Sequence, residues 1–214
     1  MSARLRPGLR RDPHTGQVRC WWPGDDALYC AYHDQEWGQP SADEVRLFEK
    51  LCLEGFQSGL SWLTILRKRE AFRRAFAGFD PQRLARFGPR DVERLLQDAG
   101  IVRHRGKIEA ALNNARRLLE LRAAGDSLPA LVWRHEPGPE ERPRRLTQAA
   151  MKQMTTCASA KALSKELKRR GWAFVGPTTV YAFMQSMGLV NDHLEGCPAR
   201  ERVEVARAKF ARPR

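Results

Sequence analysis

The sequence predicts a single all-α domain, and three observations lead to this prediction. The chain has 214 residues, the size of one ordinary domain, and 42% of them are hydrophobic, enough to form a buried core. Apolar residues recur mainly at helical spacing, and residues typical of helix starts precede several of these runs. No stretch keeps the alternation of apolar and polar residues that a half-buried strand requires.

The clearest helix start lies at residues 41–44, which read Ser-Ala-Asp-Glu. Ser41 as the N-cap and Glu44 three positions later form a capping-box pattern, in which each side chain accepts a hydrogen bond from the other residue's backbone. Apolar residues that share one face of the expected helix then follow: Val45, Phe48, Leu51 and Cys52. We therefore expect a helix to begin at this capping box.

The next helix is expected to start near residues 59–61 and to run to about Phe76. Further helices are expected at 81–87, 90–98, 105–123, 159–170 and 178–187. Pro177 stands just inside the start of the last of these, where its missing N–H costs nothing. Residues 134–145, RHEPGPEERPRR, are rich in proline and charge and predict an exposed loop.

The charge is unevenly distributed. The net charge is +13, and residues 1–19 and 200–214 each carry +4. We expect residues 20–198 to form the domain, with flexible basic extensions at 1–19 and 199–214. A basic balance favours a polyanionic partner, nucleic acid first, although arginine-rich ends that only increase solubility are an equal alternative.

Several classes of protein are disfavoured by composition. Five cysteines without a dense pattern argue against a disulfide scaffold and favour a reducing cytoplasm. No apolar run approaches the ~20 residues that a membrane span needs. The basic N-terminus lacks the apolar core of a secretory signal.

Two Cys/His pairs suggest a metal site. Cys20 and His33 have twelve residues between them, and His193 and Cys197 have three. Two sulfurs and two imidazoles suit a closed tetrahedral zinc site, which would be structural because no position is left for water. The alternative is that the cysteines are small buried apolar residues, and the 159 residues between the pairs match no short zinc-finger pattern.

Four motifs then resemble one known family. They are YCAYHDQEWG (29–38), LCLEGFQSGLSW (51–62), DAGIVRHRGKIEA (98–110) and FVGPTTVYAFMQSMGLVNDH (174–193). In this order they resemble the bacterial 3-methyladenine DNA glycosylase I family over about residues 20–197. The first nineteen residues and the 134–145 loop lie outside the matched motifs, and residues 157–161 are more basic than the family pattern.

The resemblance implies a helix-hairpin-helix glycosylase fold. It also implies one structural Zn²⁺ held by Cys20, His33, His193 and Cys197, joining the two ends of the domain. It implies an enzyme of the bacterial cytoplasm that acts on double-stranded alkylated DNA, and we expect a monomer with no membrane association.

The implied reaction requires a pocket for a base rotated out of the duplex. The resemblance places the carboxylate of Glu54 against the base edge and stacks Trp62 on a cationic ring, a contact of about 1–2 kcal/mol. The other aromatic candidates for this pocket are Tyr32, Trp37 and Tyr29. Without the resemblance, Glu54 is a surface charge or a partner of Arg67 or Lys68, and the aromatic residues are core.

Residues 98–107 resemble the hairpin that binds DNA backbone in this superfamily. Gly100 would let the chain approach a phosphate, and Arg103, Arg105 and Lys107 would add positive charge. Leu60 would wedge into the gap that the rotated nucleotide leaves. The alternatives are a hairpin that serves only packing and a leucine covered by its neighbours.

We find no lysine or aspartate after the hairpin that aligns with a nucleophile or a sugar-stabilising group; Glu120 and Asp126 are unaligned candidates. The expected enzyme is therefore monofunctional, with water attacking the sugar. Two other hypotheses are a non-catalytic DNA-binding module and a glycosylase for a different lesion.

Overall fold

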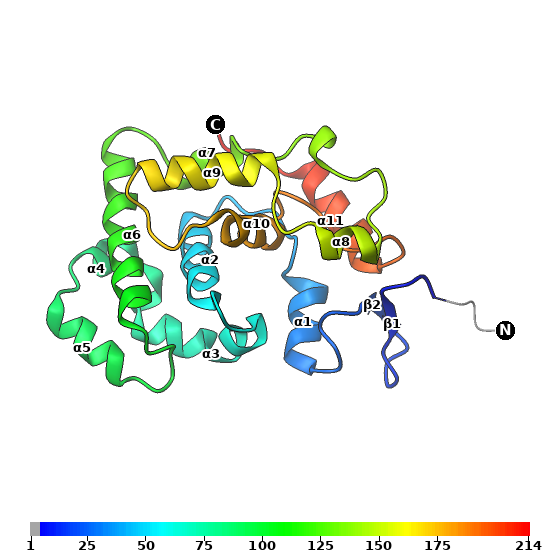
Figure 1. Ribbon diagram of the computed structural model, residues 1–214, viewed down its shortest axis with the longest axis horizontal. Helices are drawn as coiled ribbons and strands as arrows, with labels where there is room; N and C mark the ends of the chain where they lie inside the picture. The colour runs from blue at the N-terminus through cyan, green and yellow to red at the C-terminus, as the bar shows by residue number, and fades with distance from the viewer. Residues whose placement is uncertain (1–4) are drawn as a thin grey trace.

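Helices make up most of residues 5–214, the part of the chain that the computed structural model describes (Figure 1). In chain order they are α1 (Ala27–Gln35), α2 (Glu44–Gln57), α3 (Trp62–Ala75), α4 (Pro81–Ala85), α5 (Pro89–Gln97), α6 (Arg105–Ala123), α7 (Leu128–Trp133), α8 (Gln148–Gln153), α9 (Ala158–Arg169), α10 (Pro177–Ser186) and α11 (Pro198–Lys209). Single 3-10 turns lie at Ala77–Phe79 and Pro139–Glu141. The all-α prediction is confirmed.

The predicted helix positions agree closely with the structure. α6 has the predicted bounds, and the helices expected at 81–87, 90–98, 159–170 and 178–187 are α4, α5, α9 and α10, within two residues at each end. Pro177 is the first residue of α10, as the pattern indicated. The short helices α1, α7 and α8 were not predicted, and neither was α11. The α7 sequence, LPALVW, is buried on all sides and so shows no amphipathic period.

The predicted capping box at Ser41 is wrong. The N-cap of α2 is Asp43, which has an extended backbone and accepts a hydrogen bond from the Arg46 amide at 2.9 Å. Ser41 lies outside the helix, where its hydroxyl accepts a hydrogen bond from the Asp43 amide at 3.2 Å. Aspartate is as good an N-cap residue as serine. The Ser41 hydroxyl instead stabilises the turn that precedes the N-cap residue.

A short β-hairpin precedes the helices. β1 (Leu9–Arg11) pairs antiparallel with β2 (Val18–Cys20), with Leu9 opposite Cys20. In the turn between the strands, the Asp12 carboxylate accepts hydrogen bonds from the amides of His14 and Thr15, each at 2.9 Å. Strands of three residues are too short to show the alternation from which a sheet is predicted, so the sequence did not indicate this hairpin.

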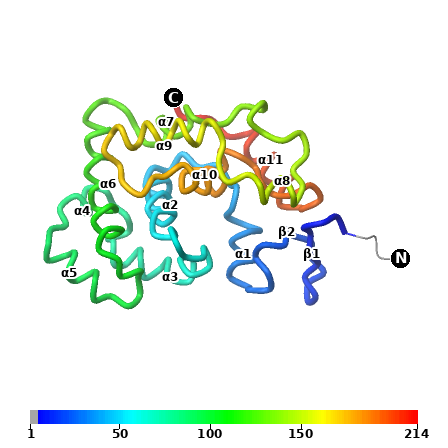
Figure 2. The backbone as a smooth tube through the Cα atoms, in the orientation of Figure 1, coloured from blue at the N-terminus to red at the C-terminus, as the bar shows by residue number. Residues whose placement is uncertain are grey.

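Both basic ends of the chain contain secondary structure. Part of the expected N-terminal extension forms the hairpin, and residues 1–4 lie outside the described residues. The expected C-terminal extension begins as α11, with Ala199 and Val203 buried one turn apart. Figure 2 shows the hairpin, in blue, and α11, in red, at the same end of the molecule, and the two elements are in contact.

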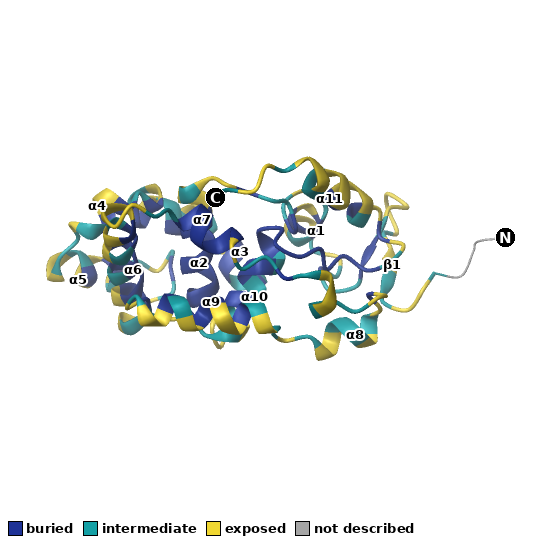
Figure 3. Cartoon of the chain, turned by 90° about the horizontal axis from the view of Figure 1, so that it is seen from above, coloured by how far each residue is buried: buried dark blue, intermediate teal, exposed yellow. Residues whose placement is uncertain are grey.

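The core is built around α2, which contacts α3, α6, α7 and α10. Figure 3 shows most of this helix buried, with many of the exposed positions on the outer helices. A smaller apolar cluster joins the chain ends, formed by Cys20, Leu146, Leu194, Cys197 and Ala199. The 134–145 loop is partly exposed, but Arg142 pairs with the buried Asp192. Among residues 5–214, no helix is both long enough and apolar enough to cross a membrane.

Candidate active site and metal site

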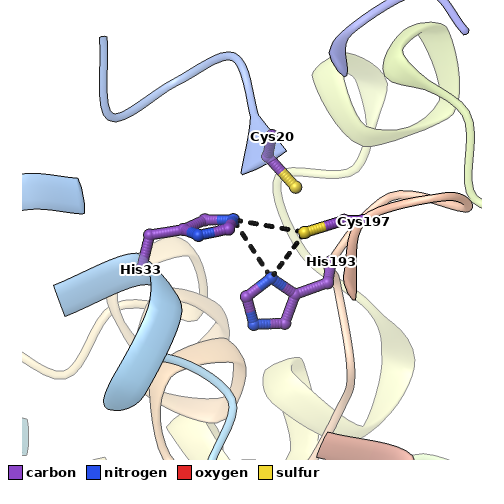
Figure 4. A group of neighbouring side chains, drawn as sticks. All are labelled: Cys20, His33, His193 and Cys197. Atoms are coloured by element: carbon purple, nitrogen blue, oxygen red, sulfur yellow. Dashed lines mark hydrogen bonds between the residues drawn. The ribbon is translucent and has the colours of Figure 1, made fainter. Parts of the chain in front are cut away.

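The four predicted metal ligands are brought together by the fold (Figure 4). Cys20 ends β2, His33 lies in α1, His193 follows α10, and Cys197 caps α11. All four side chains are buried, and their ligand atoms lie within 4.8 Å of one another. Such a group can bind a metal ion, and the proximity predicted from the two Cys/His pairs is confirmed.

The separations between the ligand atoms suit a four-coordinate ion. Nε2 of His33 lies 3.1 Å from Nδ1 of His193, and Sγ of Cys197 lies 3.8 and 3.9 Å from these two nitrogens. In an ideal tetrahedron with zinc bond lengths, the corresponding distances are about 3.3 to 3.8 Å. The donor set therefore fits a small tetrahedral cation.

Outer contacts fix the orientation of both imidazoles. Nδ1–H of His33 donates to Asp34 at 2.7 Å, and Nε2–H of His193 donates to the Trp37 carbonyl at 3.0 Å. Asp34 is held in turn by Arg19 at 3.0 Å. Hydrogen bonds of this kind select the tautomer that presents the other nitrogen to a metal.

The two thiols differ in acidity. A hydrogen bond from Cys20, followed by contacts to His193 and His33, lowers the pKa of Cys197 despite its burial. The same hydrogen bond, together with burial, raises the pKa of Cys20. Cys197 is therefore the more acidic of the two thiols, and thiolate is the form that ligates metals.

Beside this group lies a cavity of about 170 Å³. Its lining residues are Trp22, Tyr29, Tyr32, Trp37, Glu54, Gln57, Trp62, Met151, Ala182 and Gln185. All five residues predicted for the base pocket (Glu54, Trp62, Tyr32, Trp37 and Tyr29) are among them. Trp22 was missed, although its position two residues after Cys20 is a signal that could have suggested it.

The walls of this cavity come from α1, α2, α3, α8 and α10, and from the segments on either side of α1. α1 carries Tyr29 and Tyr32, and Trp62 is the first residue of α3. The Trp22 ring meets the rings of Tyr29, His33 and Trp37 edge-on, with centroids 4.9 to 5.0 Å apart. The metal-site imidazole of His33 therefore packs directly against the aromatic wall.

Glu54 is a buried carboxylate, 5% exposed, near the end of α2. Its partner is Lys50, whose Nζ lies 3.0 Å from Oε1 of Glu54. Arg67 and Lys68, the partners considered in the alternative interpretation, bond instead to Asp26 and to the Ala99 carbonyl. Burial raises the pKa of Glu54, and the nearby ammonium of Lys50 opposes this shift.

Two tryptophans of the same cavity have indole N–H groups without a partner among the described residues. Among the described residues, the buried Nε1 atoms of Trp22 and Trp62 have no hydrogen-bond acceptor. Both tryptophans line the cavity, and Trp62 lies with its ring 5.5 Å from that of Tyr32. Buried polar groups are normally paired, so these two N–H groups are exceptions beside the cavity.

The residues predicted to contact DNA lie in two places. Leu60 is 43% exposed in the loop between α2 and α3, so the covered alternative is wrong. Arg103 and Arg105 are exposed at the start of α6, where Arg105 pairs with Glu93 at 2.6 Å. Lys107 is buried and donates to the carbonyls of Phe56 and Ser58. Its ammonium therefore joins the hairpin to the loop that carries Leu60.

Gly100 lies in the hairpin between α5 and α6. A Cβ at this position would come within 2.9 Å of Cβ of Ala71 and of a carboxylate oxygen of Asp98. The Gly100 amide donates to the same carboxylate at 2.7 Å. Close packing against α3 is thus sufficient reason for glycine here, whatever the hairpin binds.

Comparison with known proteins now adds a family. The model of the family described as "Methyladenine glycosylase" matches residues 22–201. The chain belongs to this family. It is 51% identical to DNA-3-methyladenine glycosylase 1 of Escherichia coli (strain K12), over 84% of this chain and 95% of the relative. Its identity to DNA-3-methyladenine glycosylase of Haemophilus influenzae is 45%, over 86% and 98% of the two chains.

Solved structures of family members share the fold. A crystal structure of a 3-methyladenine DNA glycosylase I superposes with a TM-score of 0.79 at 49% identity, covering 84% of this chain and 98% of that one. A variant of such an enzyme in complex with 3-methyladenine gives a TM-score of 0.77 at 39% identity, covering 85% and 97%. The resemblance inferred from the four motifs is confirmed.

Proposed function

We propose that this protein is a DNA-3-methyladenine glycosylase, a monofunctional repair enzyme that hydrolyses the N-glycosidic bond of 3-methyladenine in alkylated duplex DNA. The observation that carries the proposal is Glu54, a buried carboxylate on an aromatic cavity. This cavity lies in a chain about half identical to enzymes of that name. A module that only bound DNA would not need a cavity of this kind.

Selection of the base follows from the chemistry of the cavity. N3-alkylated adenine in DNA carries a positive charge, and the Glu54 carboxylate would attract it and accept hydrogen bonds from its exocyclic amine. The face of Trp62 would stack on the ring, a cation–π contact of about 1–2 kcal/mol in a dry site. The N–H groups of Trp22 and Trp62, which have no acceptor among the described residues, would be the donors for acceptor atoms of the base.

Bond cleavage needs little from the protein beyond this pocket. The electron pair of the glycosidic bond leaves with the base, which becomes neutral, and the positive charge passes to the sugar. Water then attacks the anomeric carbon and loses a proton, leaving an abasic site. The residues of the cavity bind and orient the base and exclude water from it. They therefore contribute by selecting the alkylated base and by electrostatic stabilisation.

We infer that the metal is one Zn²⁺ held by Cys20, His33, His193 and Cys197. Two sulfurs and two imidazoles are ligands that zinc prefers, and with all four positions filled the ion would supply a structural crosslink. Because Tyr32 adjoins His33 and Trp37 bonds to His193, the crosslink would also hold the aromatic wall in place.

Duplex binding is proposed for the surface that carries Leu60, Gly100, Arg103 and Arg105. Leu60 is exposed at the loop tip and is suited to fill the gap left by a rotated nucleotide. The two arginines and the amides at the start of α6 suit phosphate contacts. We further propose a monomer that works in the bacterial cytoplasm.

The experiment is base release from methylated duplex DNA, with the products separated chromatographically. The proposal expects free 3-methyladenine and intact abasic strands without strand cleavage. Release of a different base would favour another lesion as substrate. Retention of DNA binding with no released base would favour a non-catalytic module.

A further inference from the structure

A buried lysine lies directly behind the candidate base pocket. Lys50 is 6% exposed and lies one helical turn before Glu54 on α2. Its Nζ is 3.0 Å from Oε1 of Glu54, donates to the Tyr32 hydroxyl at 2.8 Å, and lies 3.1 Å from the centre of the Trp62 ring. Every group that this ammonium contacts is thus a residue of the base pocket.

Lys50 faces a second cavity on the other side of the same residues. This cavity has a volume of about 590 Å³, and Tyr32, Trp62 and Lys50 are among its lining residues. Tyr32 and Trp62 line both cavities, whereas Glu54 lines only the smaller one and Lys50 only the larger one. The two aromatic residues therefore border both cavities, and the Lys50–Glu54 ion pair lies between them.

The contacts of Lys50 are those that a cationic base would need. A carboxylate and the face of a tryptophan are the two strongest attractions that the pocket offers to a positive charge. The Lys50 ammonium already contacts both the Glu54 carboxylate and the Trp62 ring. The negative charge of Glu54 is therefore balanced before any ligand binds. A cationic base stacked on Trp62 would then lie near a second positive charge, and like charges repel strongly in a buried site.

We propose that Lys50 is a specificity-determining residue, whose ammonium lowers the preference of the base pocket for a cationic purine over a neutral one. The inference deepens the proposed function and rests on it. The base is cationic before its glycosidic bond breaks and neutral afterwards. The repulsion from Lys50 therefore acts on the bound lesion and is relieved as the bond breaks, which favours cleavage.

The charge of Lys50 depends on its neighbours, which come from three helices. Glu54 lies on its own helix, Tyr32 lies on α1, Glu36 is the C-cap residue of α1, and Arg69 lies on α3. Burial lowers the pKa of Lys50 to about 8, while Glu54 and Glu36 act to raise it and Arg69 to lower it. The ammonium loses its proton as the pH rises through this value. The preference for a cationic purine should therefore increase with pH.

The test compares two free ligands on the whole protein without DNA. 3,9-Dimethyladeninium is a permanent cation, and 3-methyladenine is neutral; binding of each is followed by quenching of tryptophan fluorescence. In Lys50→Met, which keeps the length of the side chain, the ratio of the two affinities should shift toward the cation by on the order of tenfold. Lys165→Met, an exposed lysine on α9, is the matched control and should leave the ratio unchanged.

Lys50→Met leaves Glu54 without its cation, which threatens folding, so a second pair of variants repeats the test. Lys50→Met/Glu54→Gln has no buried charge at either position. The ratio of the affinity for the cation to that for the neutral ligand should be on the order of tenfold higher in this double variant than in Glu54→Gln. The reason is that Glu54→Gln keeps the Lys50 ammonium, whereas the double variant does not. In the wild-type protein the ratio should rise between about pH 7 and pH 9, and in Lys50→Met it should not.

The outcomes separate this inference from the proposed function. If both ligands bind but their affinity ratio is the same with and without Lys50, the role of Lys50 is overturned and the pocket survives. If neither ligand binds the wild-type protein or any folded variant, the pocket itself is overturned, and the inference about Lys50 with it.

Discussion

At the residue scale, the proposed reaction assigns its central role to Glu54, because it is the only carboxylate that lines the candidate base cavity among the described residues. Glu54→Gln keeps the shape of the side chain but removes the charge that would attract a cationic base. We expect the rate of 3-methyladenine release to fall by about 10- to 100-fold, the effect of a lost interaction of 1.4 to 2.7 kcal/mol. Excision from methylated duplex DNA measures this change.

The stability of Glu54→Gln should also decrease, since the ammonium of Lys50 loses its charged partner. Thermal melting at the assay pH establishes that the variant is folded. Glu201→Gln, which removes an exposed carboxylate on α11, serves as the control and should match the wild-type protein in both measurements. Excision by folded Glu54→Gln at the wild-type rate would remove this carboxylate from the proposed mechanism.

At the element scale, Lys107 and Arg103 at the start of α6 were both predicted to contact DNA, but they lie in different environments in the structure. Lys107 is buried and donates hydrogen bonds to the carbonyls of Phe56 and Ser58 at the end of α2. Arg103, in contrast, is exposed. Lys107→Met should lower the free energy of unfolding by about 2–3 kcal/mol, because two carbonyls lose a charged donor. Chemical denaturation measures this loss.

Arg103→Gln is the matched comparison. It should leave the free energy of unfolding unchanged. The slope of the logarithm of the DNA-binding constant against the logarithm of the salt concentration should become shallower by about 1, the value for one lost phosphate contact. Binding to a duplex at several salt concentrations tests this slope. Unaltered stability of Lys107→Met would contradict the role of Lys107 in joining the hairpin to the Leu60 loop.

How much of each element could be predicted depended on its length and on its neighbours. α6 has nineteen residues with a clear helical period, and its predicted bounds were correct. The three-residue strands and the six-residue helices give too little sequence for any period to appear. Lys50 was missed because a lysine on a helix is normally solvated, and only the fold shows that its helix face is buried.

At the scale of the whole molecule, the candidate metal site joins segments from near the two ends of the chain. Spacing alone left zinc and buried cysteine as alternatives, because ligands so far apart in sequence meet only after folding; the family resemblance favoured zinc. In the structure, the hairpin and α11 contact each other around Cys20 and Cys197, and the neighbouring apolar cluster is small. These two terminal segments should therefore depend on the metal more than the large core around α2 does.

Cys197→Ser should lose the bound metal and melt at a lower temperature than the wild-type protein. Structural zinc contributes about 10 kcal/mol or more to the folding of isolated zinc fingers, and the effect should be smaller here because a separate core exists. Metal analysis of the purified variant and thermal melting measure the two effects. Limited proteolysis should cut first within the hairpin or α11, leaving the α2–α10 region intact.

Cys157→Ser is the control for this substitution. Cys157 caps α9, where serine is a good N-cap residue, and it lies outside the four-residue metal group. Metal content should be unchanged and the melting temperature equal or slightly higher. Full metal occupancy in Cys197→Ser would show that this thiol is not a ligand. Loss of metal with unchanged melting and unchanged proteolysis would show instead that the ion does not hold the two ends together.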